Sequence, residues 1–336
     1  MIHNRFKKLA LISIAAVFAG AASTARANIL FNASFENSIT TDSNAAAIET
    51  AINNAIAFYT ANITTNITVN IAFAEMTSGL GESDTFILSV PYSTYITDLH
   101  NSSSGDSTDT TALAGLPISV TDPVNGGSTI TATFANLNAI GDPVTTPTGD
   151  PCPGGTLSGN FNACIQLNTS LTSPPQSLSG NYYLQSVVQH EIDEVLGLGS
   201  GLSSGSSPGN PHPEDLFRYN GSGNRSYSNN SCTSPPAAYF SLNGVTDIHA
   251  FNNCNNGGDY GDWASTSTPF VQDAFGTPGA TPSLSLASPE AVALDAIGYN
   301  FIGQTGTPEP GTMGLISLSL ALLGAAAYRR KKRALT

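Results

Sequence analysis

The sequence predicts an α+β domain with a small mixed sheet, a central helix and long loops, and three stretches carry this prediction. Residues 45–59 place apolar side chains at helical spacing and form a broad apolar face. Residues 67–73 alternate between apolar and polar side chains, as a half-buried strand does. Residues 187–196 return to helical spacing. Gly197 then predicts the helix end, because glycine accepts the left-handed turn after a last helical residue.

The remaining expected elements are shorter. Residues 288–299 predict a closing helix with Ser288 as its cap, Pro289 at its first position and Gly298 after its end. Stretches rich in Gly, Ser, Thr and Pro at 101–127 and 141–163 are typical of surface loops. We also expect a short helix at 91–100 and strands at 128–134, 164–168 and 239–242.

The helix at 187–196 carries a candidate metal site. His190 and Glu194 are four residues apart, so their side chains lie one above the other on a single helix face. An imidazole and a carboxylate arranged in this way can hold one side of a divalent metal, most naturally zinc. Glu191 is placed to polarise a water molecule as a general base. The alternative interpretation is a solvated acidic face on an amphipathic helix.

A third metal ligand is expected in residues 212–219, which follow a Gly- and Ser-rich run after the helix. His212 would complete a set of two imidazoles and one carboxylate. Asp215 would instead give one imidazole and two carboxylates, a set that selects zinc less strongly. The alternatives are a solvated loop histidine for His212, and a turn cap or a salt bridge to Arg218 for Asp215.

Two neighbours of these residues are candidate substrate-binding groups. Arg218 can bind a substrate carboxylate or a tetrahedral oxyanion, and Tyr219 can donate a hydrogen bond to the oxyanion. The alternative roles are pairing with an acidic neighbour for Arg218 and core packing for Tyr219.

A Gly-rich stretch at 257–263 contains Asp259, Asp262 and the only tryptophan, Trp263. The two aspartates are candidate calcium ligands, and a plain turn is the alternative.

The four cysteines are even in number, which suits disulfides in an oxidising compartment. Three pairings are possible. We favour Cys152–Cys164 and Cys232–Cys254, because each pair closes a short polar loop.

Both ends of the chain carry export addresses. Residues 1–27 combine a basic start, an apolar run and a small-x-small cleavage pattern, which predicts a signal peptide. After a linker at 301–307, residues 308–333 combine a Pro-Glu-Pro motif, an apolar run about long enough to cross a membrane and a basic cluster. This tail resembles the bacterial PEP-CTERM sorting signal, and a plain tail anchor is the alternative.

The PEP-CTERM resemblance implies a partner and a location. The partner is an exosortase-type sorting enzyme, and the C-terminal helix would anchor the chain transiently in the inner membrane. The body would then be exported to the cell surface or the extracellular matrix of a Gram-negative bacterium, or secreted from it.

The charge of the body excludes one class of partner. Of the 11 Lys and Arg residues, four lie in 1–27 and five in 308–333, which leaves Arg218 and Arg225. Nearly all the acidic residues remain in the body, so it is more acidic than the whole-chain net charge of −13 suggests. A chain of this charge is not expected to bind nucleic acid.

The helix motif His190-Glu191-x-x-Glu194 with Gly197 resembles the zinc-peptidase pattern His-Glu-x-x-His-x-x-Gly-x-x-His. It departs from that pattern at Glu194, where the second histidine would stand, and at Ser200, where the third ligand would stand. Most of residues 28–300 is also similar to bacterial surface proteins with PEP-CTERM tails that are described as metalloproteases. That similarity includes the motifs at 215–219 and 258–264, and His-Glu-x-x-Glu is common in that family.

These resemblances imply a zincin-like, specifically metzincin-like, catalytic domain over residues 28–300. The implied function is a secreted, surface-sorted zinc-dependent endopeptidase that acts on a protein or peptide. Its metal would be held by His190, Glu194 and either His212 or Asp215, with Glu191 as the base. A second hypothesis is an inactive zincin-like surface or matrix protein with a structural or adhesive role. A third is an adhesin stabilised by calcium at Asp259 and Asp262.

Overall fold

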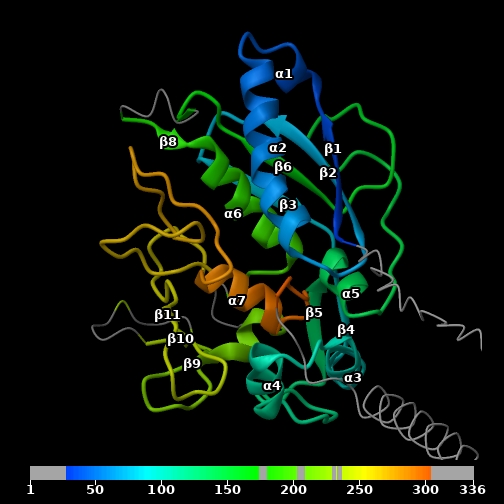
Figure 1. The fold of residues 1–336 in the computed structure, drawn as a ribbon, viewed down its shortest axis with the longest axis vertical. Helices are drawn as coiled ribbons and strands as arrows, with labels where there is room; N and C mark the ends of the chain where they lie inside the picture. Colours follow the sequence, from blue (N-terminus) through cyan, green and yellow to red (C-terminus); the bar gives the residue numbers. More distant parts are fainter. Residues whose placement is uncertain (1–27, 174–179, 203–208, 229–231, 233–236, 304–336) are drawn as a thin grey trace, which may run out of the picture.

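The computed structural model describes residues 28–173, 180–202, 209–228, 232 and 237–303 (Figure 1). The expected signal peptide at 1–27 and the expected sorting tail at 308–333 lie outside these residues, as does most of 301–307. Within the described part of the chain, no helix is both long enough and apolar enough to cross a membrane.

The described residues form a mixed α+β fold with small sheets, as expected. The elements in chain order are β1 (Leu30–Phe35), α1 (Asn37–Thr40), α2 (Ala45–Asn62), β2 (Thr68–Glu75), β3 (Gly81–Thr85), β4 (Ile87–Pro91), α3 (Tyr92–Ser102), α4 (Ser107–Ala114), β5 (Thr129–Thr133), α5 (Phe134–Ala139), β6 (Ala163–Leu167), β7 (Thr172–Ser173), β8 (Tyr182–Tyr183), α6 (Leu184–Leu196), a 3₁₀ helix (Glu214–Phe217), β9 (Arg218–Tyr219), β10 (Tyr239–Phe240), β11 (His249–Ala250) and α7 (Pro289–Ala296).

The largest sheet has the strand order β1-β2-β6-β3. Strands β1, β2 and β6 are parallel, and β3 runs antiparallel to β6 at one edge. Helix α2 connects β1 to β2, which is the kind of crossover that a parallel pair requires. The apolar positions of β2, Val69, Ile71 and Phe73, are buried, which agrees with the alternation in its sequence.

Helix α6 packs against both α2 and the edge strand β3, and Figure 1 shows it beside α2. The hydroxyl of Tyr59 on α2 lies 2.9 Å from the carbonyl oxygen of Gln189 and 2.8 Å from the carboxylate of Asp193. Val188, Ile192, Val195 and Leu196 of α6 are fully buried. Each such side chain stabilises the fold by roughly 1.5–3 kcal/mol, so α6 is held as a rigid part of the core.

The end of α6 follows the sequence expectation. Gly197 has a φ of 120°, a value that side-chain-bearing residues rarely adopt. Its N–H and that of Leu198 both reach the carbonyl oxygen of Asp193, which closes the helix. The hydroxyl of Tyr299, just after α7, donates to the carbonyl oxygen of Leu196 at 2.8 Å. The closing helix therefore supports the end of α6.

Most expected elements are confirmed, and one expectation is wrong. Helices are present near 45–59, 91–100, 187–196 and 288–299, and strands near 67–73, 128–134, 164–168 and 239–242. The expected surface loop at 101–127 contains α4. The side chain of Asp106 caps that helix by accepting a hydrogen bond from the N–H of Asp109.

The two expected disulfides are present. Cys152 is bonded to Cys164 at the start of β6, and Cys232 is bonded to Cys254. The first bond ties the loop before β6 to the sheet, and the second ties together two loops in the C-terminal half.

Candidate metal centre

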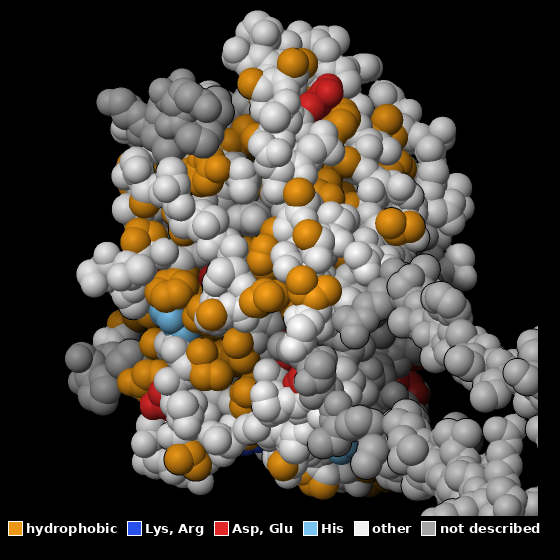
Figure 2. All heavy atoms as spheres, viewed as in Figure 1, with side chains coloured by type: hydrophobic (Ala, Val, Ile, Leu, Met, Phe, Trp, Pro, Cys, Tyr) orange, Lys and Arg blue, Asp and Glu red, His pale blue; other side chains and the backbone are white. Residues whose placement is uncertain are grey.

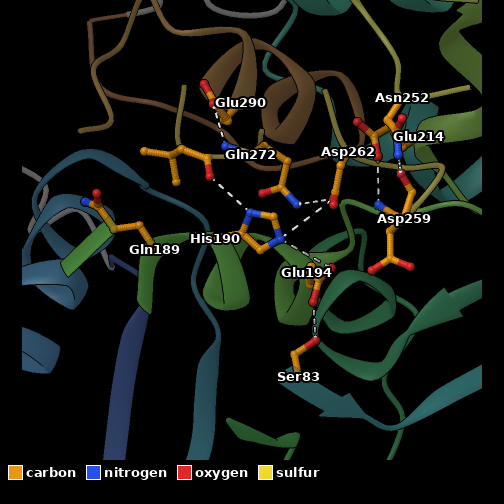
Figure 3. A network of polar contacts seen from close by, with 12 residues as sticks. Ser83, Gln189, His190, Glu194, Glu214, Asn252, Asp259, Asp262, Gln272 and Glu290 are labelled. Atoms are coloured by element: carbon orange, nitrogen blue, oxygen red, sulfur yellow. Dashed lines mark hydrogen bonds and ion pairs between the residues drawn. The ribbon is translucent and has the colours of Figure 1, made fainter. Parts of the chain in front are cut away.

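Three potential metal ligands converge beside α6 (Figure 3). The Nε2 atom of His190 lies 3.7 Å from Oε1 of Glu194 and 3.8 Å from Oδ1 of Asp262. One donor atom from each residue lies within 4.8 Å of the other two. Ligands of a tetrahedral zinc ion at about 2.0–2.2 Å lie roughly 3.3–3.6 Å from one another. Small side-chain movements would therefore bring this group to the spacing that zinc requires.

The backbone fixes which nitrogen of His190 faces this group. Nδ1 lies 3.0 Å from the carbonyl oxygen of Val271. A carbonyl oxygen can only accept a hydrogen bond, so Nδ1 carries the hydrogen and Nε2 faces Glu194 and Asp262. A carbonyl that holds the far nitrogen in this way is the usual support of a metal-bound histidine.

The two carboxylates are also held from behind. The hydroxyl of Ser83 on β3 donates to Oε2 of Glu194 at 2.6 Å. The side-chain amide of Gln272 donates to Oδ1 of Asp262 at 3.0 Å, and the backbone N–H of Gln272 donates to Glu290 on α7 at 3.0 Å. The segment that orients His190 therefore also orients Asp262 (Figure 3).

The negative charge around His190, Glu194 and Asp262 favours a bound cation. Burial acts to lower the pKa of His190, but the carboxylates of Asp262, Glu191 and Glu194 outweigh it and raise the pKa to about 10. Burial raises the pKa of Asp262 to about 7, an effect that the charge of His190 opposes. An imidazolium ion can supply the positive charge, and a divalent metal can take its place. The donor set therefore fits a metal ion.

Glu191 lies next to His190 on α6, and its carboxylate packs against β3. Glu191 is 5% exposed, and its carboxylate lies against Gly81, where an added Cβ would collide with Oε1. Burial, followed by the negative charge of Glu194, raises the pKa of Glu191 well above its usual value of 4.5. A carboxylate with a raised pKa is suited to accept and return a proton near neutral pH. Because Glu191 and Asp193 are both buried, α6 does not present a solvated acidic face.

These residues line a cleft with a volume of about 840 Å³. Its lining includes residues 79–85, which contain all of β3, and residues 257–262 and 273–277. His190, Glu191 and Glu194 lie along the cleft on α6. Its size is that of a site for a small molecule or a short peptide segment.

The expected third donors occupy other positions. Asp215 accepts hydrogen bonds from the hydroxyl of Ser200 at 2.6 Å and from the backbone N–H groups of Gly201 and His212 at 2.8 and 2.9 Å. Its carboxylate thus ties the loop after α6 to the 3₁₀ helix. His212 lines the cleft, and burial lowers its pKa. The residue grouped with His190 and Glu194 is Asp262, and neither His212 nor Asp215 belongs to that group.

Arg218 and Tyr219 do not line the cleft. Arg218 is fully buried and donates to the carbonyl oxygen of Tyr260 at 2.6 Å and to the side chain of Asn253 at 2.7 Å. Its guanidinium also lies over the ring of Phe251, 4.2 Å from the centroid. Arg218 therefore supports the loop that delivers Asp262. Tyr219 lies under the guanidinium of Arg225.

The two candidate calcium ligands, Asp259 and Asp262, make different contacts. Asp262 faces His190, whereas Asp259 lines the wall of the cleft beside it. The carbonyl oxygen of Asp259 accepts a hydrogen bond from Asn252, which fixes the loop at this point (Figure 3).

Comparison with known proteins supports the export address. A family model described as the PEP-CTERM protein-sorting motif matches residues 307–332. No curated protein and no solved structure matches the chain. The motif implies recognition by an exosortase-type sorting enzyme. It also indicates export and sorting to the cell envelope or surface of a bacterium.

Proposed function

We propose that this exported chain is a zinc-dependent endopeptidase. The observation that carries the proposal is the convergence of His190, Glu194 and Asp262 in a cleft, with the buried carboxylate of Glu191 beside them. One imidazole and two carboxylates are a ligand set that zinc accepts. Because two of the three donors are oxygens, manganese or cobalt is a competitor for the site.

A zinc ion in this position would act as a Lewis acid on a peptide carbonyl and would make water a stronger acid. Glu191 would take the proton from the attacking water as its oxygen adds to the carbonyl carbon. The same carboxylic acid would then give the proton to the amine nitrogen as the C–N bond breaks. After this second proton transfer, Glu191 is again a carboxylate. Ser83 and Gln272 would keep Glu194 and Asp262 oriented during this cycle.

The test uses the purified body, residues 28–307. We expect about one equivalent of zinc by elemental analysis, and casein cleavage that a chelator abolishes and added zinc restores. Glu191→Gln should keep the metal and lose at least about 100-fold in activity, because it removes only the base. Glu194→Gln should weaken metal binding. A body that binds no transition metal and cleaves nothing would exclude the proposal.

A non-enzymatic surface or matrix protein is the second candidate, and one observation favours it. Two carboxylates and an acidic neighbour place more negative charge around the site than neutral histidines would, so water there would be a poorer acid. This candidate predicts an intact fold without cleavage, whether the site holds zinc or a histidinium ion. Bound calcium and calcium-dependent melting would favour the adhesin version instead.

A further inference from the structure

The cleft is lined by acids. The acidic residues that line it come from α6, β3, the loop at 257–262 and the segment after it: Glu82, Asp84, Glu191, Glu194, Asp259, Asp262 and Asp273. Among the described residues that line it, none is a lysine or an arginine, and His190 and His212 are the only histidines. Even with a divalent ion between Glu194 and Asp262, the remaining acids leave the cleft negative.

The arginines of the body lie elsewhere. No lysine is present between residues 28 and 309, and the only arginines in that range are Arg218 and Arg225. Arg218 is fully buried against Tyr260 and Asn253. Arg225 donates to the carbonyl oxygen of Gly115 and stacks on Tyr219. Neither guanidinium lines the cleft, so neither offsets its charge directly. On the face drawn in Figure 2, the described residues show hardly any Lys or Arg side chain.

Strand β3 carries two of these acids, Glu82 and Asp84, at alternating positions. Among the described residues it pairs with β6 alone, which makes it an edge strand of its sheet, and all five of its residues line the cleft. Its odd-numbered residues face α6, since Ser83 bonds to Glu194 and Gly81 lies against Glu191. Glu82 and Asp84 alternate with them and are exposed. An extended peptide that paired with the free edge would therefore place every second side chain beside these two carboxylates.

We propose that the cleft selects peptide segments that carry lysine or arginine at alternating positions. Opposite charges on neighbouring strands attract, whereas an acidic segment would meet like charge at Glu82 and Asp84. Cleavage of such a segment rests on the proposed peptidase function, but its binding does not. Two exposed ion pairs and the field of the cleft would make a basic peptide bind roughly tenfold more tightly than a neutral one.

The test is a binding assay on zinc-treated Glu191→Gln protein, which would bind a substrate without cleaving it. Three fluorescently labelled peptides of one length carry Lys, Gln or Glu at alternating positions, and their affinities are measured by anisotropy. We expect the order Lys, Gln, Glu, with the differences shrinking as salt is raised from about 20 to about 500 mM. Glu82→Gln combined with Asp84→Asn should remove most of the preference for the Lys peptide. Asp247→Asn, at an exposed position outside the cleft, should leave it unchanged.

Equal affinity for the three peptides would overturn the proposal. It would also fall if Asp247→Asn reduced the preference as much as the β3 double variant did, because net charge alone would then explain it. Parallel cleavage assays with the unaltered protein separate the two proposals. Cleavage without a charge preference in binding removes only the selectivity. A charge preference that depends on Glu82 and Asp84, but without cleavage, supports the selectivity and removes the peptidase.

Discussion

The Nδ1 atom of His190 lies 3.0 Å from the carbonyl oxygen of Val271, and the next residue, Gln272, donates its side-chain amide to Asp262. A single short segment thus orients two of the three candidate metal ligands. The N–H of Gln272 is itself held by Glu290 on α7. Gln272 is fully buried and Glu290 is 1% exposed, so water cannot easily replace these bonds.

We predict that Gln272→Met lowers zinc affinity by about 10–100-fold, because Asp262 loses the donor that orients it. The free energy of unfolding should fall by about 1–2 kcal/mol, because the buried carboxylate of Asp262 loses a donor. The Oε1 atom of Gln272 is buried and has no hydrogen-bond partner among the described residues, so its removal offsets part of that loss. Competition with a chromophoric chelator measures the affinity. The matched control is Glu290→Gln, which keeps an acceptor for the N–H of Gln272 and should bind zinc normally. Unaltered affinity in Gln272→Met would show that Asp262 needs no such support.

A second prediction concerns pH. Burial raises the pKa of Asp273 from 3.8 to about 6, since one of its oxygens is buried without a partner in the described structure. The folded protein therefore holds this proton more tightly than the unfolded chain. The resulting stability is fully present below about pH 4 and is lost as the pH rises through about 6. After allowance for solvent screening, the loss is about 1–2 kcal/mol.

Asp273→Asn should remove that loss, because an amide stays neutral and still accepts the hydrogen bond from Phe270. In urea unfolding of the chelator-treated body, we expect little effect at pH 4.5 and a gain of about 1–2 kcal/mol at pH 7.5. Asp247→Asn, at an exposed position, serves as the control. A gain of the same size at both pH values would argue against a buried, raised carboxyl.

The contact between α2 and α6 gives a third prediction. In Tyr59→Phe, the carboxyl of Asp193 loses its only hydrogen bond from a side chain that the structure describes, and its other oxygen is already without a partner there. We expect a loss of about 1–3 kcal/mol in the free energy of unfolding. Among the described residues, the hydroxyl that Tyr299→Phe removes bonds to the carbonyl oxygen of Leu196 alone, so its loss should be smaller, about 0.5–1.5 kcal/mol. Equal losses would mean that the contacts of Tyr59 with Asp193 and Gln189 add nothing beyond a single hydrogen bond to a backbone carbonyl.

Much of the fold could be predicted, because each main element buries one face and therefore carries apolar residues at regular spacing in the sequence. Helix α2, strand β2 and helix α6 all carry apolar side chains at the period of their structure, and the structure confirms them. Strand β3 could not be recognised, because its sequence, Gly-Glu-Ser-Asp-Thr, contains no apolar residue. Its position is set by pairing with β6 and by packing on α6, which are long-range contacts. The sequence did contain a signal for α4, because Asp106 is a good N-cap residue and Asp109 lies in the first turn, but that helix was not predicted.

The candidate metal centre could likewise be predicted only in part. His190 and Glu194 could be paired from their spacing, since one helix carries both. Asp262 could not, because it comes from a loop whose path depends on buried contacts such as those of Arg218. Asp215 was an equally good candidate by residue type. Its carboxylate instead binds nearby backbone N–H groups, as a short acidic side chain in a turn often does.

The last prediction tests the close approach of β3 to α6. A Cβ at Gly81 would collide with the carboxylate of Glu191 and lie 2.8 Å from Cγ1 of Val187, so Gly81→Ala must push the strand or the carboxylate away. We expect a loss of about 1–3 kcal/mol in stability and, since the proposed base is displaced, a fall of at least about 100-fold in the proposed peptidase activity. Zinc content should stay near that of the unaltered protein, because no metal ligand is touched. Gly221→Ala is the matched control, since a Cβ there would meet only a ring carbon of Tyr239 at 4.0 Å. A Gly81→Ala protein that is destabilised yet cleaves at the normal rate would show that the position of Glu191 against β3 is structural and has no part in proton transfer.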